Sequence, residues 1–439
     1  MISDHRQYVH LEALKGWIND PNGLCFCNGK YHVFFQYSPD SPYGDTLRCW
    51  GHFESCDEAK SWTYTGIALR PDIPEDRSGV FSGSAVVSDN KIHIFYTGNV
   101  DDGGVREAYQ IYVTMEDGIH MSDKKVILKP SDYPGSCSCE VRDPKVWIED
   151  GKWKMVLGAK DKDGKGCVLL YEADSPDDWH FVRQLSKDGL GYMWECPDMF
   201  ELGGQTFLGV SPQGLEHEEY RYQNVYSSGF FRMEEGELKD FIEYDYGFDF
   251  YAPQTFVNEY GERILIGWMG IGDIPYTNPT AEKGWQHCLT IPRKLSVTDD
   301  GALRQWPVIH HELYGSMEEV RDGEEKKIKL PCDIVAVIES DPYTLKIDGA
   351  EISYDDNELV LDLSHGDVGQ GRTVRKVKTG KHKTLRIIAD RSSLEVFISG
   401  GRYVMSTRFY PSDDEVLISA KGGGFIVRDI SRMEINGFE

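Results

Sequence analysis

The chain has 439 residues and a formal net charge of −26, and 40% of its residues are hydrophobic. This composition is typical of a folded protein with room for two domains, each with its own hydrophobic core. The charge argues against nucleic acid as a partner, because a phosphate backbone needs a positive surface.

The first residues, MISDHRQYVHLEALKGW, hold no basic segment followed by an apolar run, and no stretch of the chain is apolar enough to span a membrane. We therefore expect a cytoplasmic protein without a membrane partner, with its ten cysteines reduced. The pairs Cys25/Cys27 and Cys137/Cys139 lack the two-residue spacer typical of zinc sites, so we expect no metal. No phosphate-binding or dinucleotide-binding loop is present, which predicts no cofactor.

One pattern occurs five times between Asn19 and Met269: a short polar motif, an apolar strand, a tight turn and a second apolar strand. The five motifs are Asn19-Asp20-Pro21-Asn22, Ser82-Gly83-Ser84, Arg142-Asp143-Pro144, Glu195-Cys196-Pro197-Asp198 and Tyr251-Ala252-Pro253-Gln254. They lie roughly 50 to 60 residues apart, and turns such as Asn28-Gly29 separate the strands, which is the signature of radial β repetition. The sequence therefore predicts an all-β fold that begins with a five-bladed β-propeller over residues 1–308.

The pattern changes after the propeller. Residues 309–325 are polar and charged, and we expect a linker there, with a short helix as the alternative. Shorter strands at close spacing over 326–439 predict a β-sandwich. Within it, Leu394, Val396 and Ile398 alternate with Glu395, Phe397 and Ser399, which predicts one inward and one outward face. Without a catalytic-looking cluster, this domain is expected to support the propeller or an assembly, and a carbohydrate-binding role is the less favoured alternative.

Three of the five motifs carry a carboxyl group: Asp20, Asp143 and Glu195. The innermost strand of each propeller blade lines the central channel, so motifs at the same place in each repeat should converge. Glycoside hydrolysis needs two carboxyl groups, one protonated and one ionised, and a third can stabilise positive charge. Mutual repulsion should raise the pKa of at least one of them. The competing interpretation is that these are structural aspartates at blade edges.

Aromatic residues lie near the motifs and could stack against sugar rings or simply pack the blades. They are Trp17, Trp50, Phe81, Trp194 and Tyr251. For Trp50 and Trp194 the two interpretations are equally balanced. We count Trp50, Phe81 and Tyr251 as candidate substrate-binding residues.

A series of motifs in this chain resembles glycoside hydrolase family 32, the group of invertases and fructanases. The first is Gly16-Trp17-Ile18-Asn19-Asp20-Pro21-Asn22-Gly23. The others follow in the family's order and are Phe34-Phe35-Gln36-Tyr37, Trp50-Gly51-His52, Phe81-Ser82-Gly83-Ser84-Ala85, Arg142-Asp143-Pro144, Trp194-Glu195-Cys196-Pro197-Asp198 and, in the last domain, Asp390-Arg391-Ser392-Ser393-Leu394-Glu395. The resemblance covers nearly the whole chain and implies a five-bladed β-propeller followed by a β-sandwich.

The resemblance also implies roles for individual residues. Asp20 would be the nucleophile, Glu195 the general acid and base, and Asp143 the stabiliser of the transition state. Asn19, Gln36, Ser82 and Arg142 would line the fructose pocket. Arg142 would also keep the neighbouring carboxylate of Asp143 ionised.

One departure from the family concerns the stretch Tyr43-Gly44-Asp45-Thr46-Leu47-Arg48-Cys49, which lacks a tryptophan that many relatives place there. The aromatic wall for fructose is therefore in doubt at this point. Arg48 could instead add positive charge at the pocket mouth, although a solvated surface arginine is an equally good interpretation.

The implied activity is retaining hydrolysis of a terminal β-fructofuranosyl linkage. The stretches Ser211-Pro212-Gln213-Gly214 and Tyr222-Gln223-Asn224-Val225-Tyr226 look most like the bacterial branch that acts on sucrose 6-phosphate. Sucrose and short fructo-oligosaccharides are the alternative substrates, and a fructosyltransferase would share the same catalytic residues. A propeller that only binds carbohydrate is the competing class, and the presence of all three carboxyl groups disfavours it.

Overall fold

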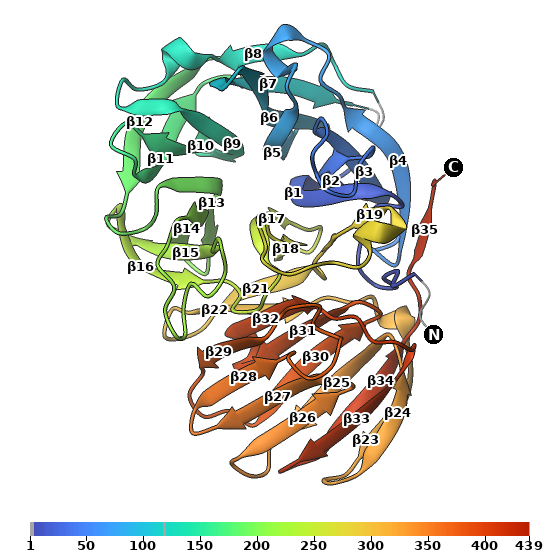
Figure 1. Cartoon of the computed structure of the whole chain (residues 1–439). Helices are drawn as coiled ribbons and strands as arrows, with labels where there is room; N and C mark the ends of the chain where they lie inside the picture. The colour runs from blue at the N-terminus through green and yellow to red at the C-terminus, as the bar shows by residue number, and fades with distance from the viewer. Residues whose placement is uncertain (1–3, 117–119, 439) are drawn as a thin grey trace.

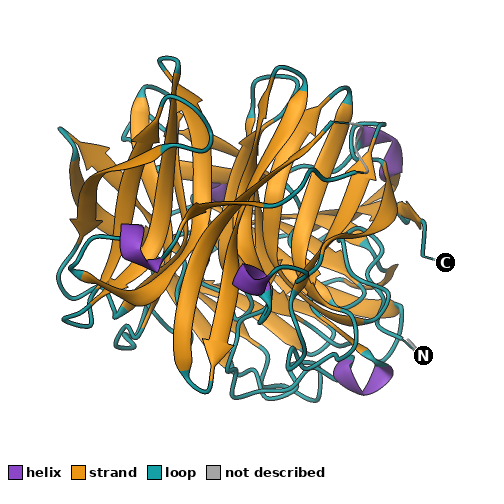
Figure 2. Cartoon of the chain, turned by 90° about the horizontal axis from the view of Figure 1, so that it is seen from above, coloured by secondary structure: helices purple, strands orange, loops and turns teal. Residues whose placement is uncertain are grey.

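A computed structural model describes residues 4–116 and 120–438 and consists almost entirely of strands. Figure 2 shows only short helical turns between them, and none of the described helices is long and apolar enough to cross a membrane. These turns are η1 (Pro74–Asp76), η2 (Pro130–Asp132), η3 (Ala281–Lys283), η4 (His311–Leu313) and η5 (Ser399–Gly401). The expected β-propeller followed by a β-sandwich is confirmed (Figure 1).

The described residues of the propeller form five sheets arranged around a centre (Figure 1). In chain order, the sheets contain β1 (Gly16–Cys27), β2 (Lys30–Ser38), β3 (Cys49–Ser55) and β4 (Ser61–Leu69); β5 (Val80–Ser88), β6 (Lys91–Asp102), β7 (Val105–Met115) and β8 (Lys125–Leu128); β9 (Cys137–Glu149), β10 (Lys152–Asp161), β11 (Gly166–Ala173) and β12 (Trp179–Ser186); β13 (Met193–Leu202), β14 (Gln205–Gln213), β15 (Gly229–Glu234) and β16 (Glu237–Glu243); and β17 (Tyr251–Val257), β18 (Arg263–Met269), β20 (Cys288–Leu289), β21 (Arg293–Val297) and β22 (Leu303–Pro307). Each repeat begins with the antiparallel hairpin that the sequence predicts.

Two strands from distant parts of the chain complete the first sheet. β19 (Trp285–Gln286) pairs in parallel with β1, and β35 (Glu434–Asn436) pairs in parallel with β4. Chain segments from the end of the propeller and from beyond the sandwich therefore both return to the first repeat.

The inner strands β1, β5, β9, β13 and β17 surround the channel, and each has an irregularity at its polar motif. In β9 the ladder pairs Arg142 with Gly158 and resumes where Lys145 pairs with Val156, so Asp143 and Pro144 are unpaired. In β13 the corresponding gap holds Cys196 and Pro197. Such bulges re-aim side chains and backbone groups away from the regular pleat.

A second set of channel residues lies on the inner strands, two positions after Asp20, Ser82, Asp143, Cys196 and Ala252. These residues are buried and polar, and they are Asn22, Ser84, Lys145, Asp198 and Gln254. We call them the polar ring, because each one bonds to another sheet.

The bonds of the polar ring connect all five sheets. Asn22 Oδ1 accepts from the backbone N–H of Gly83 at 3.1 Å, and Ser84 Oγ donates to the carbonyl of Pro144 at 2.7 Å. Lys145 Nζ lies 3.2 Å from Asp198 Oδ1 and also donates to the carbonyl of Thr255. Gln254 Nε2 donates to the carbonyl of Gly83 at 2.9 Å, which connects the fifth sheet to the second.

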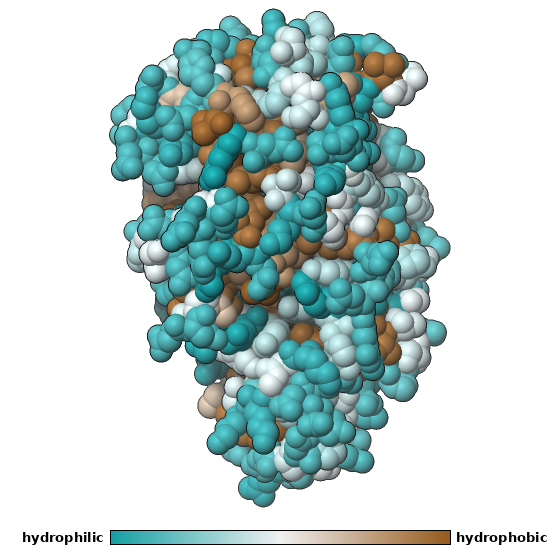
Figure 3. Space-filling model, turned by 90° about the vertical axis from the view of Figure 1, so that its left-hand side faces the viewer, coloured by the Kyte–Doolittle hydropathy of each residue, from teal (hydrophilic) through white to brown (hydrophobic). Residues whose placement is uncertain are grey.

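The sandwich consists of two six-stranded sheets (Figure 1). The first contains β23 (Tyr314–Val320), β34 (Phe425–Ile430), β25 (Cys332–Val337), β30 (Thr384–Asp390), β31 (Ser393–Ile398) and β32 (Tyr403–Arg408), and the second contains β24 (Glu325–Lys329), β33 (Glu415–Lys421), β26 (Tyr343–Ile347), β27 (Ala350–Asp355), β28 (Glu358–Asp362) and β29 (Val374–Lys378). Their inner faces form one hydrophobic core. On the face shown in Figure 3, hydrophilic residues cover most of the surface, and apolar residues gather mainly over the propeller half.

Residues 309–325, expected as a linker, contain η4 and the strand β23, which pairs with β34 in the sandwich. β23 is an edge strand with mostly exposed side chains, so its sequence is polar and lacks the alternation of a half-buried strand.

The outward face predicted for β31 is a second difference from expectation. Leu394, Val396 and Ile398 point into the sandwich core as expected, but Glu395 and Phe397 are also buried. Phe397 packs with propeller residues, because this sheet lies against the propeller rather than against solvent.

Glu395 belongs to a buried ionic cluster between the two domains. Its carboxylate accepts from Arg293 Nε at 3.0 Å and from the backbone N–H of Ile291 at 2.8 Å, and it lies 3.0 Å from His10 Nε2. Burial opposes the charge on His10, but hydrogen bonds to Asp390 and Glu395 outweigh it and raise its pKa to about 9. The contact between the domains therefore depends on charges that have no access to water.

We expect Glu395→Ala to lower the free energy of unfolding by about 3 to 5 kcal/mol, because Arg293 and His10 each lose one of two buried carboxylate partners and the N–H of Ile291 loses its acceptor. Asp300→Ala is the matched control, since it removes an exposed ion pair with Arg402 between the same domains and should have a much smaller effect. Urea unfolding of both variants measures this. An equal decrease in the free energy of unfolding of the two variants would contradict the prediction.

Candidate active site

The three predicted carboxyl groups meet in a cavity of about 440 Å³ at one end of the propeller channel. Asp20 comes from β1, Asp143 from β9 and Glu195 from β13. The cavity is lined by Trp17, Asn19, Asp20, Gln36, Arg48, Phe81, Ser82, Arg106, Arg142, Asp143, Glu195, Gln213, Tyr226, Tyr251, Trp268, Gly272 and Asp273. All of the predicted site residues except Trp50 are therefore brought together.

Asp20 lies on the floor of this cavity with hydrogen bonds to both of its oxygens. Ser82 Oγ donates to Oδ2 at 2.5 Å, and Asn19 Nδ2 donates to Oδ1 at 3.1 Å. Burial raises the pKa of Asp20, and the negative charge of Glu195 raises it further, whereas the hydrogen bond from Ser82 lowers it. The donors hold the carboxylate in a fixed orientation.

Asp143 has a left-handed backbone, with φ of 63°, at the bulge of β9. Its Oδ2 accepts the backbone N–H of Cys196 at 2.9 Å, and the Cys196 thiol lies 3.6 Å from Asp20 Oδ2 and 3.6 Å from Asp143 Oδ2. Burial raises the pKa of Asp143 to about 7, with a further contribution from Glu195. This meets the expectation that crowding raises at least one pKa.

Glu195 is held by three donors that bind both of its carboxylate oxygens. Arg142 Nε donates to Oε1 at 3.0 Å, and Oε2 accepts from Gln213 Nε2 at 2.8 Å and from the Tyr251 hydroxyl at 2.7 Å. Arg142 was expected to keep Asp143 ionised, and its charge does lower the pKa of Asp143, but its direct ion pairs are with Glu195 and Glu140. Successive side chains of a strand point to opposite faces, so Arg142 and Asp143 form no direct ion pair although they are adjacent in β9.

Two amides shape the pocket beside Asp20. Asn19 Nδ2 donates to Gln36 Oε1, and Gln36 Nε2 donates to the carbonyl of Val80 at 3.4 Å. Asn19 Oδ1 is buried and has no hydrogen-bond partner. It is therefore an acceptor available to a ligand hydroxyl, because a buried acceptor without a partner is otherwise unfavourable.

Trp50 is the one predicted residue that the structure places outside the pocket. It is fully buried in the core between the first two sheets, and its Nε1 donates to the carbonyl of Phe81 at 3.0 Å. Trp194 is likewise fully buried and donates to the carbonyl of Leu190. For both tryptophans the packing interpretation is correct, and Trp50 supports Phe81 through the hydrogen bond to its carbonyl.

Several pocket residues were not singled out from the sequence as binding residues. They are Arg106, Gln213, Tyr226, Trp268, Gly272 and Asp273, whereas Trp17, which also lines the cavity, had been named as an aromatic residue that could stack against a sugar ring. Gln213 lies within Ser211-Pro212-Gln213-Gly214, one of the stretches that resemble the family. This position is the sequence signal from which its bond to Glu195 could have been suspected. Tyr226 ends the stretch Tyr222–Tyr226 that also carries the resemblance, whereas Arg106 and Asp273 lie outside every quoted motif and are brought to the site by the fold.

Arg48 lines the pocket, as one of its two interpretations proposed. Its Nη1 donates to Ser38 Oγ at 2.5 Å, and burial lowers its pKa. Among the described residues, no carboxylate forms an ion pair with it, whereas Arg106 pairs with Glu140 at 2.8 Å. Arg48 thus presents a partly buried guanidinium beside Asp20 that forms no direct ion pair among the described residues, while the charges of Asp20 and Asp45 oppose the lowering of its pKa.

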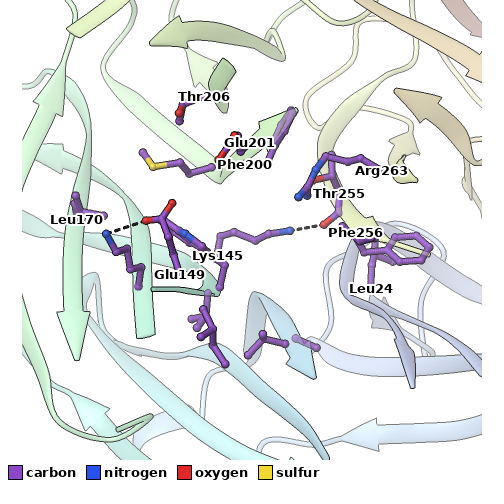
Figure 4. Close-up of a pocket in the computed structure, with 18 of the residues that line it drawn as sticks. Leu24, Lys145, Glu149, Leu170, Phe200, Glu201, Thr206, Thr255, Phe256 and Arg263 are labelled. Carbon is purple, nitrogen blue, oxygen red and sulfur yellow. Dashed lines mark hydrogen bonds and ion pairs between the residues drawn. The ribbon is translucent and has the colours of Figure 1, made fainter. Parts of the chain in front are cut away.

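A larger cavity of about 740 Å³ lies further along the same inner strands, beyond the polar ring (Figure 4). Lys145 reaches across it to the carbonyl of Thr255, and the remaining lining is mainly apolar, including Leu24, Phe200 and Phe256. It holds none of the three convergent carboxyl groups, so the chemistry belongs to the smaller cavity.

Three carboxyl groups around a pocket of sugar size, on a β-propeller, define a glycoside hydrolase. Residues 10–307 match the model of the glycosyl hydrolases family 32 N-terminal domain, and residues 349–435 match that of the family's C-terminal domain. The chain belongs to glycosyl hydrolase family 32.

Relatives agree along the whole length. Sucrose-6-phosphate hydrolase from Bacillus subtilis is 37% identical, over 95% of this chain and 92% of the relative, and raffinose invertase from Escherichia coli is also 37% identical, over 96% and 93%. The solved structure of sucrose-6-phosphate hydrolase from Lactobacillus gasseri is 28% identical, with a TM-score of 0.90, covering 98% of this chain and 94% of that one.

The raised pKa of Asp143 predicts a pH-dependent cost to stability. Its folded-state pKa of about 7 exceeds the ordinary value of 3.8, so the folded protein retains a proton that the unfolded chain has released. Stability should therefore fall as pH rises from about 4 to 7, and Asp143→Asn should remove this loss. The variant should melt higher than the wild type at pH 8, with a smaller difference at pH 4.5.

Thermal melting at the two pH values measures this difference. Asp355→Asn, the same change at an exposed position of the sandwich, should show no such trend. If the melting difference between Asp143→Asn and the wild type is the same at both pH values, the pKa of Asp143 is not raised in the folded protein.

Proposed function

We propose that this protein is a cytoplasmic hydrolase that cleaves the β-D-fructofuranosyl linkage of sucrose 6-phosphate with retention of configuration, and cleaves sucrose less efficiently. The observation that carries the proposal is the convergence of Asp20, Asp143 and Glu195 in one polar pocket of a family 32 chain. Relatives named as sucrose-6-phosphate hydrolases support the choice of substrate.

The contacts of the three carboxyl groups support a double displacement. Asp20 attacks the anomeric carbon of the fructosyl unit, while Glu195 donates its proton to the departing glycosidic oxygen. A covalent fructosyl-enzyme forms, and Glu195 then takes a proton from water as the water opens the ester to Asp20. Asp143, fixed by the backbone N–H of Cys196, accepts hydrogen bonds from fructosyl hydroxyls as positive charge develops.

Fructose selection follows from the polar side chains around Asp20. Asn19, Gln36 and Ser82 supply hydrogen-bond donors and acceptors on one side of the cavity, and Arg142 supplies donors on another side. The free Oδ1 of Asn19 is satisfied when a sugar hydroxyl binds it. Phe81 and Tyr251 contribute the aromatic surface that was expected to include Trp50.

The guanidinium of Arg48, which lines the cavity and forms no direct ion pair among the described residues, supports a preference for the phosphorylated sugar. We expect kcat/KM of the wild type to be higher for sucrose 6-phosphate than for sucrose, because a phosphate would neutralise this guanidinium in a strongly acidic protein. Arg48→Gln should reduce kcat/KM for sucrose 6-phosphate about ten- to a hundred-fold, the range expected for a lost charge-assisted hydrogen bond, and affect sucrose much less.

Steady-state kinetics with both sugars decides this, and Arg48→Lys should recover part of the loss because it keeps the charge. Equal or lower kcat/KM of the wild type for the phosphorylated sugar would rule out the preference while leaving fructoside hydrolysis intact.

We expect Asp20→Asn to reduce turnover by at least about three orders of magnitude, because an amide cannot attack the anomeric carbon. With methanol as a competing acceptor, NMR of the wild-type products should show methyl β-fructofuranoside, since two displacements restore the original configuration. Asp355→Asn serves as the control for the chemical change itself. An α-configured methyl product, or substantial turnover by Asp20→Asn, would overturn the mechanism.

A further inference from the structure

One wall of the active-site cavity consists of two residues that lie outside every inner strand. The Tyr226 hydroxyl donates to Asp273 Oδ2 at 2.6 Å, and both residues line the cavity. Tyr226 bridges to Gln213, which binds Glu195, and its ring lies 5.8 Å from that of Tyr251. We call Tyr226 and Asp273 the outer wall.

The outer wall stands beside Glu195 rather than beside the fructose-binding amides. Asn19, Gln36 and Ser82 come from the first two sheets and surround Asp20. The acid must reach the glycosidic oxygen, so groups next to Glu195 and away from Asp20 meet the leaving group. A tyrosine hydroxyl and a carboxylate are suited to bind the hydroxyls of a departing hexose.

The first loop of the outer wall is attached to the sandwich. This loop, residues 214–228, connects β14 to β15, and in Figure 1 it descends toward β29. Gln223 Nε2 donates to the carbonyl of Lys376 at 2.8 Å, and Gln223 Oε1 accepts the N–H of Lys376 at 3.0 Å. The side-chain amide thus occupies the free edge of β29, the last strand of its sheet.

The next residue of this loop strengthens the same attachment. Asn224 Oδ1 accepts from Arg375 Nη2 at 2.7 Å, and Asn224 Nδ2 donates to the carbonyl of Gly247 at 2.7 Å. The Arg375 guanidinium also stacks over Phe248 at 3.9 Å. Two consecutive side chains therefore fix the loop two residues before Tyr226.

The second loop, residues 270–280, carries Asp273 and is held by the turn that precedes β29. The N–H of Thr277 donates to the carbonyl of Gln370 at 3.1 Å. Arg372, which is fully buried against Asp249, donates to the carbonyl of Thr277 at 3.1 Å and to Asn278 Oδ1 at 2.7 Å. Arg372 also lies over the Tyr276 ring at 4.1 Å.

We propose that residues 370–376 of the sandwich are a positioning element that fixes the outer wall and so determines how tightly the leaving group binds. Both wall loops depend on this short segment, which contacts neither Asp20 nor Glu195. The inference rests on the proposed function, since it assigns the outer wall to the leaving-group side of that same site.

The test uses Gln223→Ala and Asn224→Ala in the full-length protein with two fructosides that differ only in the leaving group. Each variant should raise KM for sucrose about five- to ten-fold, the value of one or two lost hydrogen bonds, with kcat within a factor of about two. Methyl β-fructofuranoside, whose leaving group cannot reach the outer wall, should keep its wild-type kcat/KM within about two-fold.

A double-mutant cycle distinguishes positioning from a general loss of stability. Tyr226→Phe removes the bond within the outer wall, so its effect on KM for sucrose should be strongly non-additive with that of Gln223→Ala. Arg402→Ala, which breaks an ion pair between the same two domains away from both loops, is the matched control and should leave both substrates unaffected.

The outcomes separate this inference from the proposed function. A wild type that hydrolyses neither fructoside would refute the proposed function. A wild type that hydrolyses both, with Gln223→Ala and Asn224→Ala affecting the two substrates equally or not at all, or with additive effects in the cycle, would refute the positioning role alone. A variant that melts far below the wild type is replaced by Gln223→Glu, which keeps an acceptor for the Lys376 N–H and should show a smaller form of the same KM change.

Discussion

The need to satisfy buried polar groups at the centre of the propeller is the constraint on which the rest of the molecule depends. Each inner strand is irregular at its motif, so backbone groups there lose partners within their own sheet. Their partners come from the neighbouring sheets, through the polar ring and through contacts such as that from Cys196 to Asp143. The same interactions between neighbouring sheets therefore close the propeller and build the active site.

The active site contains backbone conformations and buried carboxyl groups that are unfavourable on their own. Asp143, Cys196 and Ala252 have left-handed backbones immediately before proline, and Asp20 and Asp143 are buried close to another carboxyl group. Such features persist only when the surroundings over-determine them. The hydrogen bonds of the polar ring hold these strained residues in place from the neighbouring sheets. The sandwich stabilises them through the ionic cluster around Arg293 and Glu395.

Local patterns were sufficient to predict the repeats, the hairpins and the three carboxyl groups, because each depends on a few adjacent residues. The motifs that resemble the family also identified Asn19, Gln36 and Ser82. The failures involve long-range packing. Strand alternation cannot show whether Trp50 faces a pocket or a neighbouring sheet, and the ion pairs of Arg142 include one with Glu195 from another sheet.

The outer wall and the buried outward face of β31 were beyond prediction for the same reason. Tyr226, Asp273 and Glu395 acquire their roles from contacts between the two domains, and no periodicity within one segment encodes such contacts. The polar character of β23 was read as a linker because an exposed edge strand has little need of apolar residues.

The pairing of β35 with β4 has a consequence for how the protein is made. The outer edge of the first sheet, formed by residues 61–69, stays open until residues 434–436 have been synthesised and can pair with Ser61, Trp62 and Thr63. An open strand edge invites pairing with other chains. The first blade to emerge from the ribosome is thus the last to be completed, and the nascent protein carries an exposed edge through nearly the whole of translation.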